Sequence, residues 1–430
     1  MPRNISPTRF RKLALAAVFS LLAVALLQAA ALPTAKPAEV GLSAERLDRL
    51  TRVMQEYIDG GKIAGMVTLV ARNGRVAYLR PFGKLDLNGA AMPANGIFRI
   101  ASQTKAVTSV AVMILQEEGK LLIDDPISRY IPEFSKARVA VPAADKSAKG
   151  YATVDVKRPI TIRDLLTHTA GISYGDGPAK DEYVAAGIHG WFLADKAVPI
   201  GEIVKKLATL PFDAQPGEKW VYGYNADILG DLVERVSGMT LADFFSRKIT
   251  GPLGMADTHF FLPQDKLGRF TSVYGIDDKG GLKLMEDARD NSYVKGPRVC
   301  YAGGAGLLAT AEDYARFLLM LQGGGELGGV RVLSPKSVEL MTVDHVGNLY
   351  GSEGFGLGFW VTDRLGRNGQ PGSVGSFGWG GAYHTTYWVD PAEKLVAVLM
   401  TQLLPAGSSD LHAKFRAMVY QSIVDSYEKR

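Results

Sequence analysis

Strand patterns at both ends of the chain, with helical patterns between them, limit most strongly how these 430 residues can fold. Near the start, two short apolar segments flank Asn73-Gly74, a dipeptide that favours the tight turn of a β-hairpin. Near the end, residues 383–402 give two similar segments around Asp390-Pro391, and a closing helix is predicted from about Asp410. The simplest arrangement is one antiparallel sheet built from both chain ends, with helices packed on it.

The middle of the chain has a different pattern of apolar and polar residues. From Thr104 to about Gly251, helix patterns alternate with loops rich in Gly and Pro, and strand patterns are few. We therefore predict an α/β (α+β) fold with a discontinuous α/β domain, residues 32–110 and 290–430. A mostly helical lobe, residues 111–289, is inserted between the two parts. Residues 262–298 are polar and give no clear element.

The first 31 residues have the three parts of a secretory signal peptide. An apolar run from Leu13 to Leu27 precedes Ala29-Ala30-Ala31, which is typical of a cleavage site. The basic residues before that run are Arg3, Arg9, Arg11 and Lys12. We expect a periplasmic or secreted protein without stable membrane insertion after cleavage. The alternative is an uncleaved anchor, for which the apolar run is short.

Charge and cysteine content exclude several classes of partner. Four of the 49 Lys and Arg residues lie in the leader, against 44 Asp and Glu, so the mature chain is nearly neutral and nucleic acid is not expected as a partner. Cys300 is the one cysteine of the sequence, so no intramolecular disulfide is possible. With six scattered His, neither a zinc site nor another metal or cofactor is expected.

The segment IASQTKAVTSVAVMILQEEG, residues 100–119, predicts a strongly apolar helix with Ser102 at its start and Lys105 one turn later. Side chains three residues apart share a helix face, so the two can meet. A neutral amine within hydrogen-bond reach can take the proton of a serine hydroxyl, and burial disfavours the charged form of an amine. A serine at a helix start also has a free N–H that can face an oxyanion.

The pattern S-x-x-K alone is weak, because it occurs three times, at Ser102, Ser292 and Ser426. Ser292 lies in a polar stretch and Ser426 is four residues from the C-terminus, whereas Ser102 heads a long apolar helix. The alternative for Ser102 and Lys105 is a helix cap and a lysine whose stem packs on apolar surface.

A rival nucleophile is Ser173 in GISYG, which matches the G-x-S-x-G elbow of α/β-hydrolases. His384 or His412 could complete its triad in chain order. However, an elbow needs a strand before the serine and a helix after it, and here an amphipathic helix pattern precedes Ser173 and a loop follows.

Beyond these local patterns, the chain from about Val40 to its end resembles the class C β-lactamase type of serine hydrolase, and within it the family VIII carboxylesterases. The matching blocks, in chain order, are FRIASQTKAVTSVAVMILQEEGKLLIDDPISRYIPEF, LLTHTAGISY, WVYGYNADILGDLVERVSGMTL, PLGMADTHF, AGGAGLLATAEDYARFL and GWGGAYHTTYWVDP. This resemblance implies the β-lactamase and penicillin-binding-protein fold. It also implies Ser102 as nucleophile, Lys105 as its base, and Tyr222 as a phenol that shuttles the proton to the leaving group.

The sequence departs from the β-lactamase pattern at two places. In the Y-x-N block the third position is Tyr224, with Asn225 one residue late, so an amide contact to a β-lactam is in doubt. The K-T-G motif is replaced by Trp379-Gly380-Gly381, which removes a cation for a substrate carboxylate and supplies an apolar wall. Both departures favour a neutral ester.

Further substrate contacts follow from the same resemblance. The backbone N–H groups of Ser102 and Ala382 are the expected oxyanion donors, since Gly380 and Gly381 allow a close approach of the backbone. Tyr174 is expected in the pocket wall, and Trp379, Gly380, Gly381 and Tyr224 complete the expected substrate-binding set.

The sequence therefore predicts an exported carboxylesterase that cleaves small, short-chain acyl esters through an acyl-serine intermediate. A β-lactamase or D-amino-acid-specific peptidase of the same fold is the main alternative, and weak β-lactam hydrolysis is compatible with the first. A non-catalytic penicillin-recognising binding protein is the third possibility.

Overall fold

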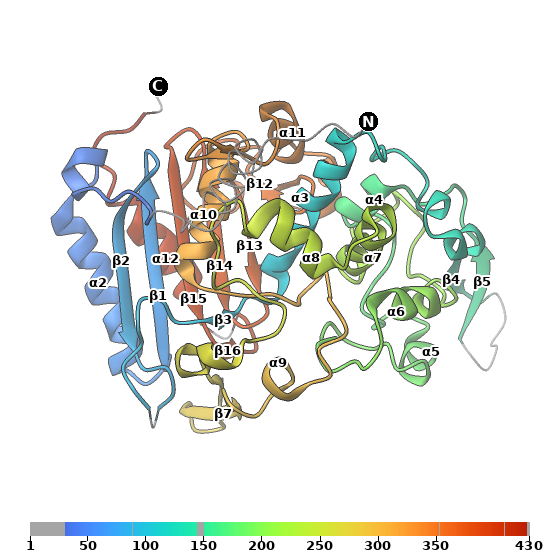
Figure 1. Ribbon diagram of the computed structural model, residues 1–430, viewed down its shortest axis with the longest axis horizontal. Coiled ribbons are helices and arrows are strands. Elements are labelled where there is room, and N and C mark those ends of the chain that lie inside the picture. The colour runs from blue at the N-terminus through green and yellow to red at the C-terminus, as the bar shows by residue number, and fades with distance from the viewer. Residues whose placement is uncertain (1–30, 88, 144–149, 352, 408, 428–430) are drawn as a thin grey trace, which may run out of the picture. The chain divides into compact units, whose positions relative to one another are not determined.

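A seven-stranded antiparallel sheet joins the two ends of the chain in the computed structural model, which describes residues 31–87, 89–143, 150–351, 353–407 and 409–427 (Figure 1). Its strand order is β11-β12-β13-β14-β15-β1-β2. The bounds are β1 Gly65–Arg72, β2 Arg75–Gly83, β11 Gly354–Phe355, β12 Trp360–Val361, β13 Phe377–Gly381, β14 Thr385–Asp390 and β15 Leu395–Thr401. The pairing of β1 with β15, with Leu69 opposite Val398, unites the two predicted hairpins. The predicted fold class is thus confirmed.

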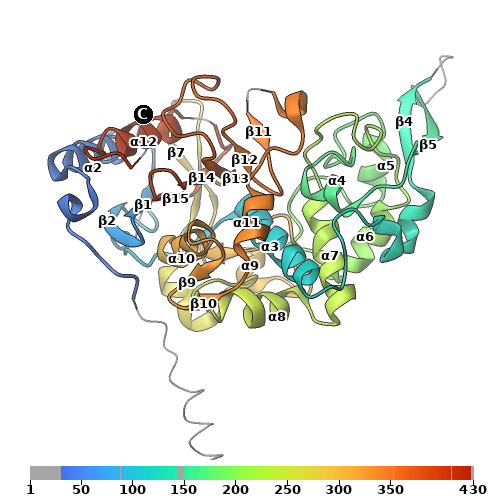
Figure 2. The same cartoon turned by 90° about the horizontal axis from the view of Figure 1, so that it is seen from above.

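Helices cover both faces of this sheet, which explains why every residue of β15 is buried. Helices α2 (Ala44–Asp59) and α12 (Leu411–Tyr420) lie on one face, and α10 (Ala311–Gln322) lies on the other (Figure 2). Helix α2 begins where the Ser43 side chain accepts the Arg46 N–H, and it ends at Gly60. Leu399 and its alternate neighbours pack under α2 and α12, following the two-residue period of a strand.

Helix α3 (Thr104–Glu117) lies between the sheet and the helical part of the chain (Figure 1). Every residue from Thr104 to Leu115 is buried, in keeping with a helix that is apolar all round. Around it, the helical part contains α4 Ile162–Leu166, α5 Lys180–Ala185, α6 Ile200–Leu207, α7 Asn225–Ser237, α8 Leu241–Phe245 and the short turns η3 Ile127–Arg129, η4 Pro132–Lys136 and η5 Ser246–Thr250.

The helical part also contains a hairpin that the sequence did not indicate, β4 (Arg138–Pro142) paired with β5 (Tyr151–Asp155). The polar region 262–298 likewise contains elements. They are η6 Gln264–Arg269, β6 Val273–Ile276, β7 Leu282–Glu286 and α9 Ser292–Lys295. Strand β6 pairs in parallel with β16 (Leu403–Leu404), so this region is attached to the C-terminal part of the chain.

The remaining elements are short. They are η1 Pro37–Val40, β3 Phe98–Arg99, η2 Ala101–Gln103, β8 Leu308–Ala309, β9 Glu326–Leu327, β10 Val330–Arg331, α11 Pro335–Met341 and η7 Gly347–Tyr350. Residues Pro33–Arg430 form one compact unit, and the division into 32–110 with 290–430 and 111–289 stays a prediction.

The predicted leader lies outside the described residues, apart from Ala31. Across the described ranges, no helix combines the length and the apolar character needed to cross a membrane.

Candidate active site

Ser102 lies in a single 3₁₀ turn, η2, between strand β3 and helix α3. The preceding residue, Ala101, is fully buried and has a φ of +42°, in the left-handed region that non-glycine residues rarely adopt. Such a backbone conformation persists only where the surrounding packing imposes it. The turn leaves the Ser102 side chain at the edge of a cavity, with 8% of the residue exposed, and its N–H belongs to the first turn, which lacks intrahelical acceptors.

Lys105 is 2% exposed and its amine is surrounded by three oxygen atoms. Its Nζ lies 3.2 Å from Ser102 Oγ, 3.0 Å from Tyr174 OH and 2.8 Å from the Gly304 carbonyl oxygen. The carbonyl can only accept a hydrogen bond, and Tyr174 OH can accept a second one. A neutral amine therefore has its lone pair left for the Ser102 hydroxyl proton, which is the arrangement of a general base.

Two phenols flank the amine in different ways. Tyr174 OH bonds to Lys105, whereas Tyr222 places its ring 4.6 Å from Lys105 Nζ and its OH accepts the Trp379 Nε1–H at 3.2 Å. Burial, followed by the influence of Tyr222 and Asp227, raises the pKa of Tyr174 well above its ordinary value. Tyr174 therefore stays protonated. The expected roles of Tyr222 as proton shuttle and Tyr174 as wall residue are both compatible with this geometry. The direct hydrogen bond between Tyr174 OH and the Lys105 amine was not expected.

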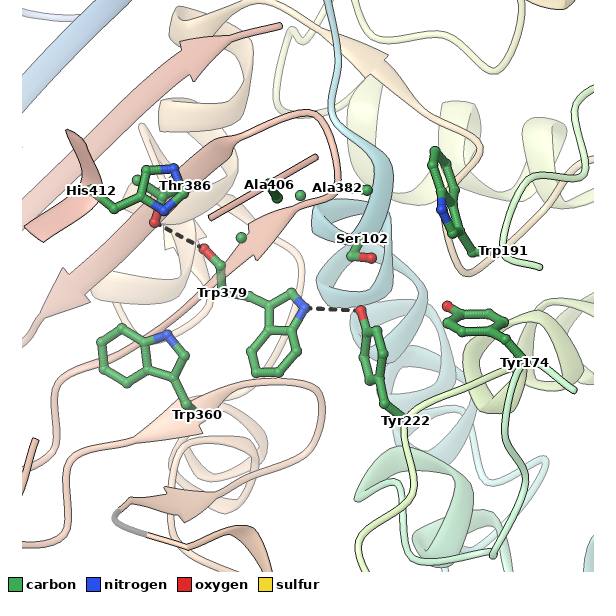
Figure 3. A pocket seen from close by; sticks show the side chains of 12 residues that line it. Ser102, Tyr174, Trp191, Tyr222, Trp360, Trp379, Ala382, Thr386, Ala406 and His412 are labelled. Carbon is green, nitrogen blue, oxygen red and sulfur yellow. Dashed lines mark hydrogen bonds between the residues drawn. The ribbon is translucent and has the colours of Figure 1, made fainter. Parts of the chain in front are cut away.

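The cavity in front of Ser102 has a volume of about 400 Å³, and five of its twelve lining residues are Tyr or Trp (Figure 3). Its lining residues are Ser102, Tyr174, Trp191, Tyr222, Trp360, Trp379, Gly380, Gly381, Ala382, Thr386, Ala406 and His412. None of these lining residues is Asp, Glu, Lys or Arg, so the walls suit a neutral ligand. Trp191 and Trp360 were not predicted, because each comes from a segment without a recognisable motif. His412 was named only as a possible triad partner of Ser173 and not as part of this cavity.

Tyr224 does not line this cavity, although a substrate contact was expected for it. It is fully buried behind Tyr174, its OH donates to the Gly190 carbonyl at 2.6 Å, and the two rings meet edge to face at 5.0 Å. Asn225 is also buried, and its amide donates to the Ile172 carbonyl at 3.2 Å and contacts His168 Nδ1 at 2.9 Å. Tyr224 and Asn225 therefore stabilise the loop that carries Tyr174, and neither residue lines the cavity.

Strand β13 brings Trp379, Gly380 and Gly381 to the cavity. A Cβ atom on Gly381 would lie 2.4 Å from the Ile100 carbonyl oxygen, so only glycine allows the strand to lie against the nucleophile segment. Ala382 follows at the turn, and its N–H has no backbone acceptor among the described residues. Both amides expected to hold the oxyanion are therefore at the same cavity.

Asp227 is a residue of the site that the sequence reasoning missed. It lies in the first turn of α7, five residues after Tyr222, and is 2% exposed. One oxygen accepts the Gly304 N–H at 2.9 Å, and the other has no partner in the described part of the chain. Burial raises the pKa of this carboxyl to about 6, against the opposing effect of Lys105. Gly304 thus links Asp227, through its N–H, to Lys105, through its carbonyl.

The rival serine is placed differently. Ser173 Oγ accepts the Gly175 N–H at 3.1 Å, and the segment runs from α4 through a loop to α5, without the strand and helix of a nucleophile elbow. His384 and His412 bond to Ser409 and to the His384 carbonyl, respectively. In the described ranges, no group of three or more His, Cys, Asp or Glu side chains is placed to hold a metal ion.

Comparison with known proteins agrees with this geometry. The family model described as Beta-lactamase matches residues 50–421. Protein Rv1367c of Mycobacterium tuberculosis is 36% identical over 389 residues, covering 85% of this chain and 92% of the relative. Esterase EstB of Burkholderia gladioli is 30% identical over 413 residues, covering 90% and 98%.

A solved structure of similar fold is that of EstCE1, described as a hydrolase with promiscuous acyltransferase activity. Its TM-score is 0.76 at 28% identity, with 87% of this chain and 98% of EstCE1 covered. The predicted resemblance to β-lactamase-type hydrolases and family VIII esterases is confirmed. The chain belongs to the beta-lactamase family of serine hydrolases.

Proposed function

We propose that the protein is a carboxylesterase that hydrolyses small, neutral, short-chain acyl esters through an acyl-Ser102 intermediate. The observation that carries the proposal is the 3.2 Å contact between Lys105 Nζ and Ser102 Oγ beside a cavity lined by uncharged residues. Trp379 at the position of the β-lactamase lysine supports an ester over an anionic lactam. The names of EstB and EstCE1 point the same way.

The first half of the proposed reaction acylates Ser102. The Lys105 amine, acting as general base, takes the hydroxyl proton while Ser102 Oγ attacks the ester carbonyl carbon. The N–H groups of Ser102 and Ala382 stabilise the negative oxygen of the tetrahedral intermediate. As the bond to the alcohol breaks, the proton passes through Tyr222 to the leaving oxygen, and the alcohol departs.

The second half releases the acyl group. A water molecule gives its proton to the same amine and phenol pair and attacks the acyl carbon. The intermediate then collapses to a carboxylic acid, and Ser102 recovers its proton. An acceptor alcohol can replace water in this step. A second cavity of about 290 Å³ shares Trp360, Thr386 and His412 with the first, and it offers room for such an alcohol. Acyl transfer is therefore the second candidate activity.

A p-nitrophenyl ester series of increasing acyl length tests the proposal. We expect turnover on the short chains and fluorophosphonate labelling that maps to Ser102. S102A should lower kcat by about 10⁴-fold or more, while S173A, the matched serine control, stays active. Absence of both turnover and adduct would favour a non-catalytic binding protein. Faster turnover of nitrocefin than of any ester would favour a β-lactamase, and added alcohols report acyl transfer through the ester product.

We also propose that the protein is exported. The basic and apolar leader supports export to the periplasm or the medium. N-terminal sequencing of the protein recovered from the periplasmic fraction would locate the cleavage site.

A further inference from the structure

The turn between β13 and β14 contains a histidine where the backbone favours glycine. Ala382, Tyr383 and His384 connect the strands, and the His384 N–H donates to the Gly381 carbonyl at 3.0 Å. His384 has a φ of +68°, as expected for the last residue of a three-residue hairpin loop. A side chain in this left-handed conformation is strained, so the surrounding contacts must hold it there.

The imidazole of His384 is fully buried and both of its nitrogens have partners. Nδ1 accepts the Gly407 N–H at 3.3 Å, and Nε2 lies 3.0 Å from Ser409 Oγ. Burial, together with the neighbouring His412, lowers the pKa of His384 to about 3. The ring is therefore neutral, which leaves Nδ1 able to accept. These contacts attach the turn to the segment that leads into α12.

A second histidine holds the same turn from α12. The His412 ring stacks on the His384 ring with centroids 4.1 Å apart and planes 20° apart. Its Nε2 lies 3.0 Å from the His384 carbonyl oxygen, and since that oxygen can only accept, His412 is the donor. His412 also lines the cavity in front of Ser102 (Figure 3).

We propose that His384 and His412 are positioning residues that together fix the Ala382 amide against Ser102. The proposal rests on the proposed function, in which Ala382 N–H is an oxyanion donor. Ala382 is two residues before His384 in the same turn, and Gly381 lies directly against the carbonyl of Ile100. Loss of the histidine contacts therefore lets the donor move relative to the nucleophile.

This role predicts a specific kinetic signature. The oxyanion develops in the transition state and not in the bound ester, so a misplaced donor lowers kcat and leaves KM largely unchanged. Complete loss of one oxyanion donor costs roughly 10²- to 10³-fold in kcat. A displaced donor should cost less, about 10- to 100-fold.

Three variants of the pair separate the contacts. H412F keeps a ring for stacking but has no donor, and H412Q restores an N–H. H384G relieves the strained backbone and removes the ring. The control is H345F, because His345 Nε2 also bonds to a carbonyl, that of Leu340 at 2.8 Å, and does not line the cavity. H384N, which tolerates the left-handed conformation, serves if H384G does not fold. H412A, which also lacks the donor, serves if H412F does not fold.

The measurements are kcat and KM on a short p-nitrophenyl ester, the affinity for a boronic acid that mimics the tetrahedral intermediate, and the melting temperature. We expect H412F and H384G to lose kcat and boronate affinity together at near-constant KM, H412Q to recover part of both, and H345F to match the wild type. Unchanged kcat in H412F and H384G, or equal losses in H345F, would overturn the proposal. Since labelling of wild-type Ser102 and ester turnover are measured first, their absence overturns the proposed function instead, and this inference with it.

Discussion

At the scale of single residues, the two phenols near Lys105 have different partners. Tyr174 OH is held by the amine itself, and burial keeps it protonated. Tyr222 is held through its OH by the Trp379 indole, and it lines the cavity next to Ser102. Trp379, which stands in place of the β-lactamase lysine, thus also orients the Tyr222 phenol. We infer that Tyr222 moves the proton and that Tyr174 orients the amine.

Phenylalanine substitutions separate these roles. Y222F should lower kcat by about 10²- to 10³-fold, because a proton-transfer group is lost. Y174F should lower it by about tenfold, because Lys105 keeps two of its three partners. Y224F is the control: its OH bonds to Gly190 outside the cavity, so it should lower the melting temperature and leave kcat near the wild-type value. A larger loss in Y174F than in Y222F would assign the proton transfer to Tyr174.

At the scale of elements, an ionic cluster fixes the short helix η6 to the segment between η5 and η6. Asp257 accepts two hydrogen bonds from Arg269, at 2.7 and 2.6 Å, and lies 2.9 Å from Lys266 Nζ. Its own N–H donates to Asp313 of α10 at 2.7 Å. Burial opposes the charge of Asp257, but the hydrogen bonds from Arg269 and Lys266 outweigh it and lower its pKa to about 2.

This cluster gives a pH-dependent stability. A carboxyl whose pKa falls from 3.8 to about 2 on folding stabilises the protein above about pH 4 and loses that effect as the pH falls toward 2. D257N should therefore lower the free energy of unfolding by about 2 kcal/mol at pH 7, and by less at pH 3. Urea unfolding at both pH values measures the difference. D278N, at an exposed turn, is the control, and an equal deficit at both pH values would contradict the charge-based account.

At the scale of the whole molecule, one arginine connects segments far apart in the sequence. Arg72, at the end of β1, is fully buried and donates through its guanidinium to the carbonyls of Val40, Gly41 and Asp425. It also bonds to the Glu393 carbonyl at 3.0 Å and to the Glu393 carboxylate at 2.5 Å. Each guanidinium N–H has an acceptor, so the early segment, the β14–β15 turn and the C-terminal segment depend on one side chain.

Removal of that side chain tests this dependence. R72M should lower the free energy of unfolding by about 3 to 5 kcal/mol, because it leaves the buried Glu393 carboxylate without its cation. R75M is the control: Arg75 pairs with Glu39 at the surface, and its loss should cost under about 1 kcal/mol. The kcat of the folded fraction should be unchanged, since Arg72 does not line the cavity. Equal effects of the two variants in urea unfolding would contradict the proposed role.

Local patterns in the sequence were sufficient for much of the fold. Asn73-Gly74 forms the turn between β1 and β2, and Ser43 caps α2, because turns and caps depend on residues within a few positions of each other. The spacing of Ser102 and Lys105 likewise places both on one face near the start of α3. The union of the two chain ends in one sheet was also predictable, since an isolated hairpin is marginally stable and gains stability when its edge pairs with further strands.

The assignment of partners inside the site depended on the tertiary structure. Tyr174 and Tyr222 come from different loops, and only packing decides which OH meets Lys105. Asp227 resembles any acidic residue in the first turn of a helix until its burial and its bond from the Gly304 N–H show that it is linked to Lys105 through Gly304. The sequence by itself indicated the terminal hairpins and the long apolar helix, because these follow from short-range periodicity. It singled out Ser102 as the candidate nucleophile through that helix and the ordered set of family blocks, not through the S-x-x-K spacing alone. Tertiary structure decided the cavity and its proton-transfer partners, because these contacts join residues tens to hundreds of positions apart.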